Sequence, residues 1–296
     1  MKYLSEVYGK GGVYAKCVAA SVANGIPIYT LETKAPKFID AEFEKHRMLS
    51  SNSSSSRAIP FKKLDEIYLP FDLRKNQKGM QGYESLNITE LSEFHNWAIN
   101  AEYYIHENLE KFFKDKIHKQ HLNRYLEPWM FQKKVVTATQ WDNFFKLRLA
   151  PDAQPEIQEL ARCMKETIDK IELTELSPGE WHLPYINDWD TSTPKRKNIA
   201  IKCSVARCAR VSYFNMDNSN PSVEKDLELY DRLLSSKHLS CFEHQATPMR
   251  SNRISLFNPL TKLENGITHF DTEGRCWSGN FKYWIQYRQL VSNWNE

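Results

Sequence analysis

Cationic and hydroxyl-bearing residues are concentrated in one short stretch of the chain, between positions 45 and 57. Lys45, His46 and Arg47 open this stretch, and Arg57 closes it. The residues between them that can hydrogen-bond a ligand are Ser50, Asn52, Ser55 and Ser56. Arginine forms bidentate charge-assisted bonds with phosphate, and serine hydroxyls add neutral ones. The stretch therefore predicts a phosphate-wrapping loop, and the alternative is a solvated basic turn followed by a flexible serine linker.

A second candidate is Arg148, which lies in the apolar context FFKLRL. A buried guanidinium needs a compensating partner, because an uncompensated buried charge is costly. We therefore predict that Arg148 meets a group distant in sequence or a ligand. Its permanent charge suits the stabilisation of negative charge in a dry pocket.

Several common catalytic motifs are absent from the sequence. Gly9, Gly11 and Gly12 do not form a phosphate-binding glycine loop, and His106-Glu107 lacks the second histidine of HExxH. The six cysteines contain no CxxC pair, which argues against a zinc ribbon or a redox dithiol. We expect reduced, mostly buried thiols and no metal site. The cysteines are Cys17, Cys163, Cys203, Cys208, Cys241 and Cys276.

The composition is that of a soluble globular protein. The chain has 296 residues, of which 41% are hydrophobic and 26% charged, and its formal net charge is +3. No window approaches the ~18 to 20 apolar residues of a membrane span, and the first twelve residues lack a signal-peptide core. The mild positive charge does not indicate nucleic-acid binding. These features predict a cytoplasmic protein with no membrane partner.

The element pattern predicts an α+β fold with a mostly antiparallel sheet flanked by helices, in one catalytic domain spanning 1–296. Strand-forming residues and the basic stretch occupy 13–57, with a short helix running to Arg47. A mainly helical part covers 90–171, in which apolar stripes predict helices over 90–118 and from Pro155 to Ile171, and Val135 to Thr137 favour a strand. The remaining expected segments are a long loop over 172–200, a block over 201–245 with a helix at 223–235, and an aromatic helix over 278–294.

Two segments together resemble a known family, the flavin-dependent thymidylate synthases. TLETKAPKFIDAEFEKHRMLSSNSSSSR (Thr30 to Arg57) is similar to the family's signature, in which a strand and helix lead to RHRxxSxNExSxR. NFFKLRLAPDAQPEIQELA (Asn143 to Ala161) is similar to its later NFLxLR and AQxEI segments. The two matches occur in the family's order, which makes them more specific than either alone.

A third match occurs in a permuted position. SVARCARVSY (Ser204 to Tyr213) and LYDRLLSSKHLSCFEH (Leu229 to His244) resemble the family's usual N-terminal segment, with its ARVS stretch and HxTPFEH motif. Here this block follows the signature instead of preceding it. The order resembles that of bacteriophage members, which would place the enzyme in the host cytoplasm.

The resemblance implies roles for individual residues of this chain. Arg148 would be catalytic, placed against the pyrimidine. The implied substrate-binding residues are Ser55, Ser56, Arg57, Arg124 and Arg148, and the implied flavin- or folate-side residues are Lys45, His46, Arg47, Asn52, Asn143, Ser212, His238 and Ser240. Lys45 replaces the first arginine of the family's triplet.

The resemblance also implies the reaction, the cofactors and the assembly. The family transfers a one-carbon unit from methylenetetrahydrofolate to C5 of deoxyuridine monophosphate, with reduction through FAD and with NADPH as reductant. It needs no cysteine nucleophile, which agrees with the absence of a marked one here. The implied assembly is a homotetramer with shared sites, whose partners are the nucleotide and folate substrates.

Three departures from the signature leave alternatives open. Ser53 stands in place of a glutamate, Glu42 in place of a glutamine, and Ala58 in place of a tyrosine. Altered groups around the base could make the protein a pyrimidine nucleotide hydroxymethylase acting on deoxyuridine or deoxycytidine monophosphate. A further alternative is a non-catalytic nucleotide- or nucleic-acid-binding protein that keeps the basic residues.

Overall fold

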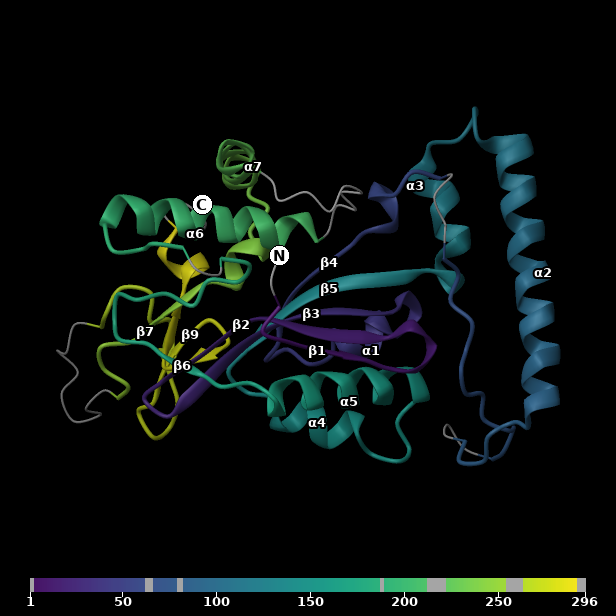
Figure 1. Ribbon diagram of the computed structural model, residues 1–296, viewed down its shortest axis with the longest axis horizontal. Helices are drawn as coiled ribbons and strands as arrows, with labels where there is room; N and C mark the ends of the chain where they lie inside the picture. Colours follow the sequence, from purple (N-terminus) through teal and green to yellow (C-terminus); the bar gives the residue numbers. More distant parts are fainter. Residues whose placement is uncertain are drawn as a thin grey trace.

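A six-stranded sheet forms the centre of the molecule (Figure 1). The computed structural model describes residues 3–61, 66–78, 82–186, 189–211, 222–253 and 263–291. The sheet order is β1-β2-β3-β5-β4, all neighbours antiparallel, and β6 adds a parallel pairing to β2. The strands are β1 (Ser5–Tyr8), β2 (Tyr14–Ala23), β3 (Ile26–Pro36), β4 (Ser50–Ser53), β5 (Phe131–Ala138) and β6 (Thr174–Glu175). The predicted antiparallel α+β class is confirmed.

The longest hairpin, β2–β3, turns at Asn24 and Gly25. Both residues have positive φ angles, 52° and 72°. An Asn-Gly pair in this conformation matches the right-handed twist of the flanking strands, so the local sequence specifies the turn. The hairpin confirms the strands predicted within 13–33.

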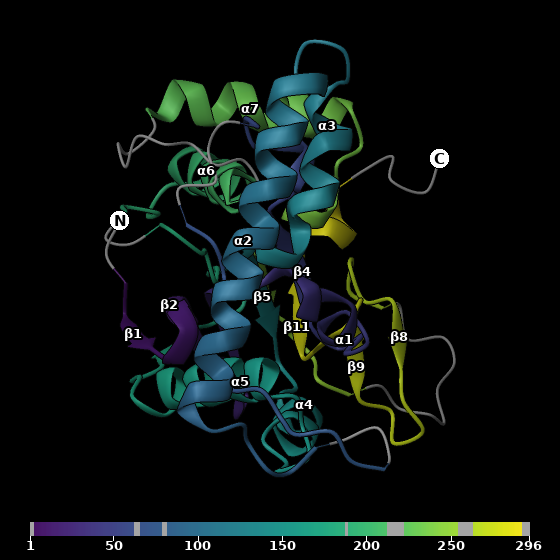
Figure 2. The ribbon, with the colours of Figure 1, turned by 90° about the vertical axis from the view of Figure 1, so that its right-hand side faces the viewer.

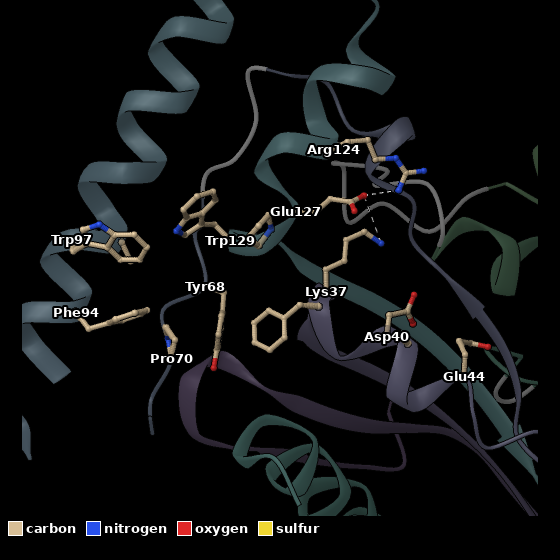
Figure 3. Close-up of a pocket in the computed structure, with 14 residues that line it drawn as sticks. Lys37, Asp40, Glu44, Tyr68, Pro70, Phe94, Trp97, Arg124, Glu127 and Trp129 are labelled. Atoms are coloured by element: carbon tan, nitrogen blue, oxygen red, sulfur yellow. Dashed lines mark hydrogen bonds and ion pairs between the residues drawn. The ribbon is translucent and has the colours of Figure 1, made fainter. Parts of the chain in front are cut away.

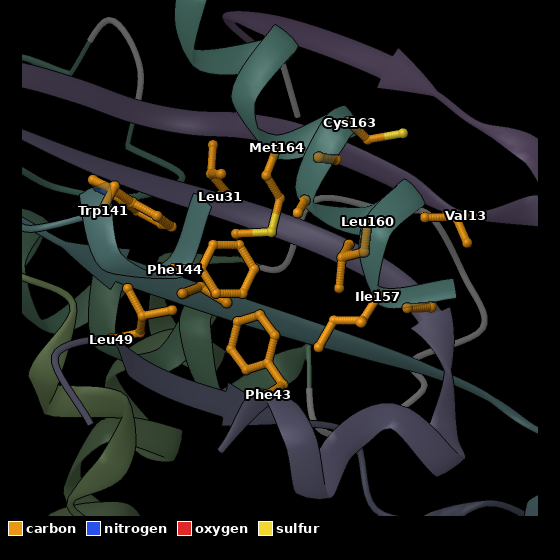
Figure 4. Close-up of a cluster of buried hydrophobic side chains, with 14 of the residues drawn as sticks. Val13, Leu31, Phe43, Leu49, Trp141, Phe144, Ile157, Leu160, Cys163 and Met164 are labelled. Carbon is orange, nitrogen blue, oxygen red and sulfur yellow. The ribbon is translucent and has the colours of Figure 1, made fainter. Parts of the chain in front are cut away.

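One face of the sheet is covered by α4 (Asp142–Arg148) and α5 (Pro155–Asp169) (Figure 1). Leu160 and Met164 of α5 pack with Phe144 of α4 and Leu31 of β3 in an apolar core (Figure 4). This core fixes the end of α4, where Arg148 lies. The helix predicted from the apolar stripe after Pro155 is confirmed.

The opposite face is covered by α6 (Pro194–Arg210) and α7 (Val223–Ser235) (Figure 1). Val205 and Ala209 of α6 and Leu233 of α7 pack against Val18 and Val135 of the sheet. The 3₁₀ helix η5 (Ser240–Glu243) follows α7 and joins the same core through Phe242. The block that resembles the family's N-terminal segment thus lies directly on the central sheet.

Helix α2 (Ile88–Phe113) runs along the outside of the molecule (Figures 1 and 2). Asn87 and Glu90 form a capping box at its first turn, which satisfies backbone donors that the helix leaves unpaired. Ala98 and Glu102 are its buried residues. The helix predicted over this region is confirmed, and α3 (Lys119–Leu122) and the 3₁₀ helix η4 (Asn123–Trp129) follow it.

The prediction of an aromatic helix over 278–294 is wrong. This segment forms β10 (Phe281–Lys282), β11 (Trp284–Gln286) and a single 3₁₀ turn, η6 (Tyr287–Leu290). Positive φ angles at Gly279 (57°) and Tyr283 (65°) interrupt any helix, and β11 pairs with β7 (Ala246–Pro248). The remaining strands, β8 (His269–Phe270) and β9 (Cys276–Ser278), form a second small sheet with β10. Tertiary pairing overrides the helix-like spacing of the aromatic residues.

Two other predicted boundaries also need correction. The long loop expected over 172–200 is shorter, because α6 begins at Pro194 with Thr193 as its N-cap, and β6 lies within it. The helix expected to run to Arg47 is the short α1 (Asp40–Phe43), preceded by the 3₁₀ turn η2 (Lys37–Ile39). The serine stretch is β4 followed by the 3₁₀ turn η3 (Ser56–Ala58), so the linker alternative fails.

The cysteine prediction is confirmed, since all six thiols are free and buried. Among the residues that the structure describes, no helix combines the length and apolar character needed to traverse a bilayer.

A chain of buried side chains ties the later segments to the sheet. His182 contacts Ser21 (3.0 Å) and Thr30 (2.8 Å), and Thr30 contacts Thr137 at 2.7 Å. Thr137 in turn contacts His244, at the end of η5, at 2.9 Å. Burial lowers the pKa of both histidines to about 3, and the neighbouring charge of His244 adds to the shift at His182. Both imidazoles are therefore neutral hydrogen-bonding groups at physiological pH.

We expect the stability of the protein to fall as the pH drops below 6.5. Between pH 6.5 and 3 the unfolded chain binds protons at these histidines that the folded chain does not. Stability is therefore complete above pH 6.5 and declines by up to about 1.4 kcal/mol per pH unit for each histidine. Urea unfolding at a series of pH values measures this slope. A His182→Gln/His244→Gln variant should have a shallower slope, and an unchanged slope would contradict the assignment.

Candidate active site

Arg148 ends α4 and points back to the helix that precedes the basic stretch. Its Nε donates a hydrogen bond to His46 Nε2 at 2.8 Å, and its Nη2 donates to the Glu42 carbonyl oxygen at 3.0 Å. The distant partner predicted for Arg148 is therefore a pair of neutral hydrogen-bond acceptors, the His46 imidazole and the Glu42 carbonyl oxygen. Within the described residues, no carboxylate lies within ion-pair distance of Arg148. Its positive charge remains available to an anionic ligand.

The chemical state of His46 follows from this contact. Burial and the charge of Arg148 both lower the pKa of His46. The imidazole is therefore neutral at physiological pH, with Nε2 accepting from the guanidinium. Its ring also packs edge-on against Phe144, with ring centroids 4.9 Å apart. His46 thus fixes the orientation of Arg148 and leaves its charge uncompensated.

Arg148 lines a cavity of about 710 Å³. The α4–α5 connection forms one wall and Asp72 and Arg74 form another. Arg74 is itself held by an ion pair with Asp72 at 3.0 Å. A fixed arginine at the side of a cavity of this size can meet a small-molecule ligand.

The basic stretch meets the 201–245 block at Asn52. The Asn52 side chain donates to the carbonyl oxygen of Cys208 in α6 at 3.0 Å and accepts from the hydroxyl of Ser240 in η5 at 3.1 Å. Ser50, two residues earlier, accepts from Gln286 of β11 at 3.1 Å. Asn52 and Ser240, both expected on the flavin side, therefore lie together although they are far apart in sequence.

A third group gathers around Glu127. Its Oε1 atom accepts from Ser56 Oγ at 2.5 Å and from Arg124 Nη1 at 2.7 Å, and Lys37 Nζ lies 3.9 Å away. Two cations share one carboxylate, so this corner retains about one positive charge. Ser56 and Arg124, both predicted to bind the substrate, therefore lie close together and bond the same carboxylate oxygen of Glu127.

This corner opens onto a cavity of about 890 Å³ between α2 and the body of the molecule (Figure 3). Figure 3 shows an aromatic half and a charged half. Its aromatic side chains are Phe38, Tyr68, Phe94, Trp97 and Trp129, and its charged side chains are Lys37, Asp40, Glu44, Arg124 and Glu127. Planar faces beside charged groups suit an amphipathic planar ligand.

Lys134 of β5 anchors α1, which leads into the basic stretch. The side chain is almost fully buried; its Nζ lies 2.5 Å from Asp40 Oδ1 and also pairs with Glu44. The ammonium group also lies 4.3 Å from the ring centroid of Phe43. Because Asp40 and Glu44 stand one turn apart, this bridge fixes both ends of the short helix.

Three of the predicted cations are exposed. Lys45 and Arg47 follow α1, and Arg57 lies in η3. In the part of the chain that the structure describes, none of the three has an ion-pair partner. Exposed cations without a carboxylate partner are suited to phosphate groups of ligands.

The other predicted site residues have weaker support from the geometry. Ser55 accepts a bond from the backbone N–H of Arg57 at 3.3 Å and so caps η3. Asn143 and His238 are exposed. Ser212 lies outside the described residues.

Half of the chain is similar to a known protein family. Residues 24–172, half of the chain, match the family model described as thymidylate synthase complementing protein. The chain belongs to this family. The match contains β3, the basic stretch, α2, α4 and α5, so the family predicted from the signature is confirmed.

A curated relative matches over part of its length. The flavin-dependent thymidylate synthase of Aquifex aeolicus (strain VF5) is 28% identical over 145 residues, which are 47% of this chain and 45% of that protein. The match thus spans less than half of the relative. A crystal structure of the UMP/dUMP methylase PolB from Streptomyces cacaoi, bound with 5-Br UMP, aligns with a TM-score of 0.45 at 16% identity, covering 56% of this chain and 92% of that chain.

The two arginines predicted to bind the nucleotide line different cavities in this chain. Arg148 lines the cavity of about 710 Å³, whereas Arg124 lines the cavity of about 890 Å³. Among the residues that the structure describes, the two cavities have no lining residue in common. The structure therefore places His46 beside Arg148 and Ser56 near Arg124. Within a single chain, the two arginines line separate cavities.

Two residues of the site, Glu127 and Lys134, were not predicted from the sequence. Glu127 lies three residues after Arg124 on a helical turn, and this spacing could have revealed the ion pair. Lys134 lies on a central strand and meets carboxylates some ninety residues away. The alternating pattern of the strand does not reveal these contacts, because Lys134 lies beneath α1 only once the sheet is packed.

Proposed function

We propose that the protein transfers a one-carbon unit from methylenetetrahydrofolate to C5 of deoxyuridine monophosphate, with FAD as the bound cofactor and NADPH as reductant. Membership of the family supports the reaction class. The observation that carries the proposal is Arg148, which a neutral His46 orients without cancelling its charge. Such a guanidinium can stabilise negative charge that develops on a pyrimidine ring.

The residues around the basic stretch fit an anionic, dinucleotide-sized cofactor. Lys45 and Arg47 are exposed cations, and Asn52, five residues after Arg47, meets Ser240 in a polar seam. In this proposal Lys45 and Arg47 neutralise the pyrophosphate of FAD, and Asn52 and Ser240 line the flavin side. When bound, the flavin supplies the hydride that reduces the transferred methylene unit.

We further propose that the whole chain works as one catalytic unit within a homotetramer whose sites are shared between copies. The seam between β4 and η5 supports the single unit. The separation of Arg124 and Arg148 into two cavities supports shared sites, since a nucleotide that needs both would use one from each copy. Light scattering tests the assembly; a monomer that still binds flavin would refute it.

An absorbance spectrum of the purified protein, followed by mass analysis of the product, tests the function. The substrates are deoxyuridine monophosphate, methylenetetrahydrofolate and NADPH. A flavin spectrum with thymidylate as product is the expected result. Failure to bind added flavin would favour a non-catalytic nucleotide-binding protein and would refute the proposal.

A hydroxymethylated product is the second candidate. It is favoured by the type of residue at position 42, where a carboxylate stands in place of the glutamine of the signature; the backbone carbonyl oxygen of this residue accepts from Arg148, which places it beside that arginine. Ser53 on β4 and Ala58 in η3 are the other departures, and both are half-buried. Detection of a hydroxymethyl nucleotide, or turnover only with deoxycytidine monophosphate, would select this candidate.

We expect Arg57→Ala to weaken binding of the nucleotide with little effect on the chemical step. Loss of a charge-assisted bond to phosphate should raise KM for deoxyuridine monophosphate about 10- to 100-fold, with kcat within a few-fold of the parent. Steady-state kinetics measure both constants. Lys195→Ala, at an exposed cation on α6, is the matched control. An equal rise in KM in the control would contradict the role of Arg57.

A further inference from the structure

One side of α2, next to the cavity that holds Arg124, carries a stripe of mostly exposed side chains. Trp97 and Tyr104 form its centre and are 62% and 70% exposed. The stripe follows three- and four-residue steps, so its members share one side of the helix. Its residues are Glu90, Glu93, Trp97, Asn100, Ala101, Tyr104, Asn108 and Lys111. Large exposed aromatic side chains in one stripe mark an interaction surface.

The order of residues along the stripe is self-complementary. Trp97 and Tyr104 lie equally far from the point between Asn100 and Ala101. Glu90 and Lys111 also lie equally far from that point, with the acidic residue at the start of the helix and the basic residue at its end. A second α2 in antiparallel orientation would therefore place aromatic against aromatic and carboxylate against ammonium, twice each.

We infer that α2 pairs with α2 of a second copy about a two-fold axis between Asn100 and Ala101. A two-fold contact uses the same patch on both copies, which explains why the stripe is symmetric in chemistry. An unrelated partner would require no such symmetry. Asn100 and Ala101 are small enough at the centre to let the helices approach closely.

The pairing has a consequence for the neighbouring cavity. Trp97 belongs both to the stripe and to the wall of the cavity that holds Arg124 (Figure 3). Tyr104 of the second copy would pack beside Trp97 and narrow the mouth of that cavity. The inference rests on the proposed homo-oligomer but not on the proposed flavin or pyrimidine chemistry.

Cross-linking at the axis tests the pairing in the full-length protein. The six native cysteines are buried, so a new surface thiol is selectively reactive. Ala101→Cys should give a covalent dimer on mild oxidation or with a short bis-maleimide. Ile99→Cys, on the far side of the same helix turn and 41% exposed, is the matched control and should remain uncrosslinked. Equal cross-linking of both variants, or of neither, would overturn the inference.

A charge swap provides an independent test. Lys111→Glu should weaken self-association about tenfold, because two symmetry-related attractions become repulsions. Adding Glu90→Gln, which removes the new repulsion and keeps the capping box, should restore part of it, and sedimentation velocity measures both effects. Unchanged association in Lys111→Glu, or no rescue by the second change, would overturn the pairing. If the variants do not change cross-linking or association, the α2 pairing is refuted and the proposed reaction is unaffected. If the pairing is found but the protein does not bind flavin, the proposed reaction is refuted and the pairing is unaffected.

Discussion

Replacing Arg148 with lysine is expected to lower kcat by about 100- to 1,000-fold. Lysine keeps the positive charge but cannot reproduce the two bonds that fix the guanidinium, from Nε to His46 and from Nη2 to the Glu42 carbonyl oxygen. The ammonium group would therefore lack a fixed direction toward the reacting ring. Stopped-flow or steady-state assays of product formation measure the loss.

The control for Arg148 is Lys146→Ala. Lys146 is an exposed cation on the same helix, two residues earlier, and its removal should leave kcat unchanged. Flavin absorbance and the melting temperature should stay close to those of the parent in both variants. Activity of Arg148→Lys within fivefold of the parent would remove Arg148 from the catalytic role.

His46→Phe separates orientation from charge. The variant keeps the contact with Phe144 but loses the acceptor for Arg148 Nε. We expect kcat to fall while Arg148 stays in place through its bond to Glu42. His46→Gln, which restores an acceptor, should recover part of the loss. Equal activity in the two variants would indicate that His46 serves packing alone.

The second large effect concerns stability, at Asp226 of α7. This carboxylate is fully buried and accepts bonds from Arg207 at 2.9 Å and from Arg210 at 3.1 and 3.0 Å. The guanidinium of Arg207 also bonds the Tyr185 carbonyl oxygen and lies 4.9 Å from the Trp189 ring centroid. One carboxylate thus compensates two arginines between α6 and α7.

Asp226→Ala is expected to reduce the free energy of unfolding by about 3 to 5 kcal/mol, because two guanidinium groups lose their shared counter-charge in a poorly hydrated site. Urea unfolding measures the change. Asp231→Asn, at an exposed position of the same helix, should change stability by less than about 0.5 kcal/mol. A loss below about 1 kcal/mol in Asp226→Ala would show that the site is well hydrated.

The consequence of Asp226 for function runs through α6. Cys208 of that helix accepts the bond from Asn52, and Asn52 also accepts from Ser240. A displaced α6 would therefore disturb the seam where the flavin is proposed to bind. Partial loss of flavin affinity in a folded Asp226 variant would agree with this connection.

Much of the local structure could be predicted because it depends on neighbouring residues. The apolar spacing after Pro155 predicted α5, and the run from Val223 predicted α7 with its observed bounds. Both helices present one apolar side to the core, so periodicity alone was sufficient. The family was predictable for a related reason, since its signature and its later NFLxLR segment are continuous stretches with fixed spacing.

The C-terminal segment shows where such reasoning fails. Trp284, Ile285 and Gln286 are all buried, so no pattern of exposed positions in the sequence distinguishes a strand from a helix here. Pairing with β7 decides the outcome, and β7 lies some forty residues earlier. The position of Lys134 beneath α1 was equally hidden, because its carboxylate partners lie on a different element.

The sequence by itself determined the fold class, the burial of the cysteines, the main helices and the family to which the chain belongs. These properties follow from composition, periodicity and short motifs in a recognisable order, all of which can be read along the chain. Only the tertiary structure decided that His46 orients Arg148, that Ser240 meets Asn52, and that Arg124 and Arg148 line separate cavities. The physical reason is that a hydrogen bond between residues more than a hundred positions apart depends on how strands pair and helices pack, and local spacing carries no record of it.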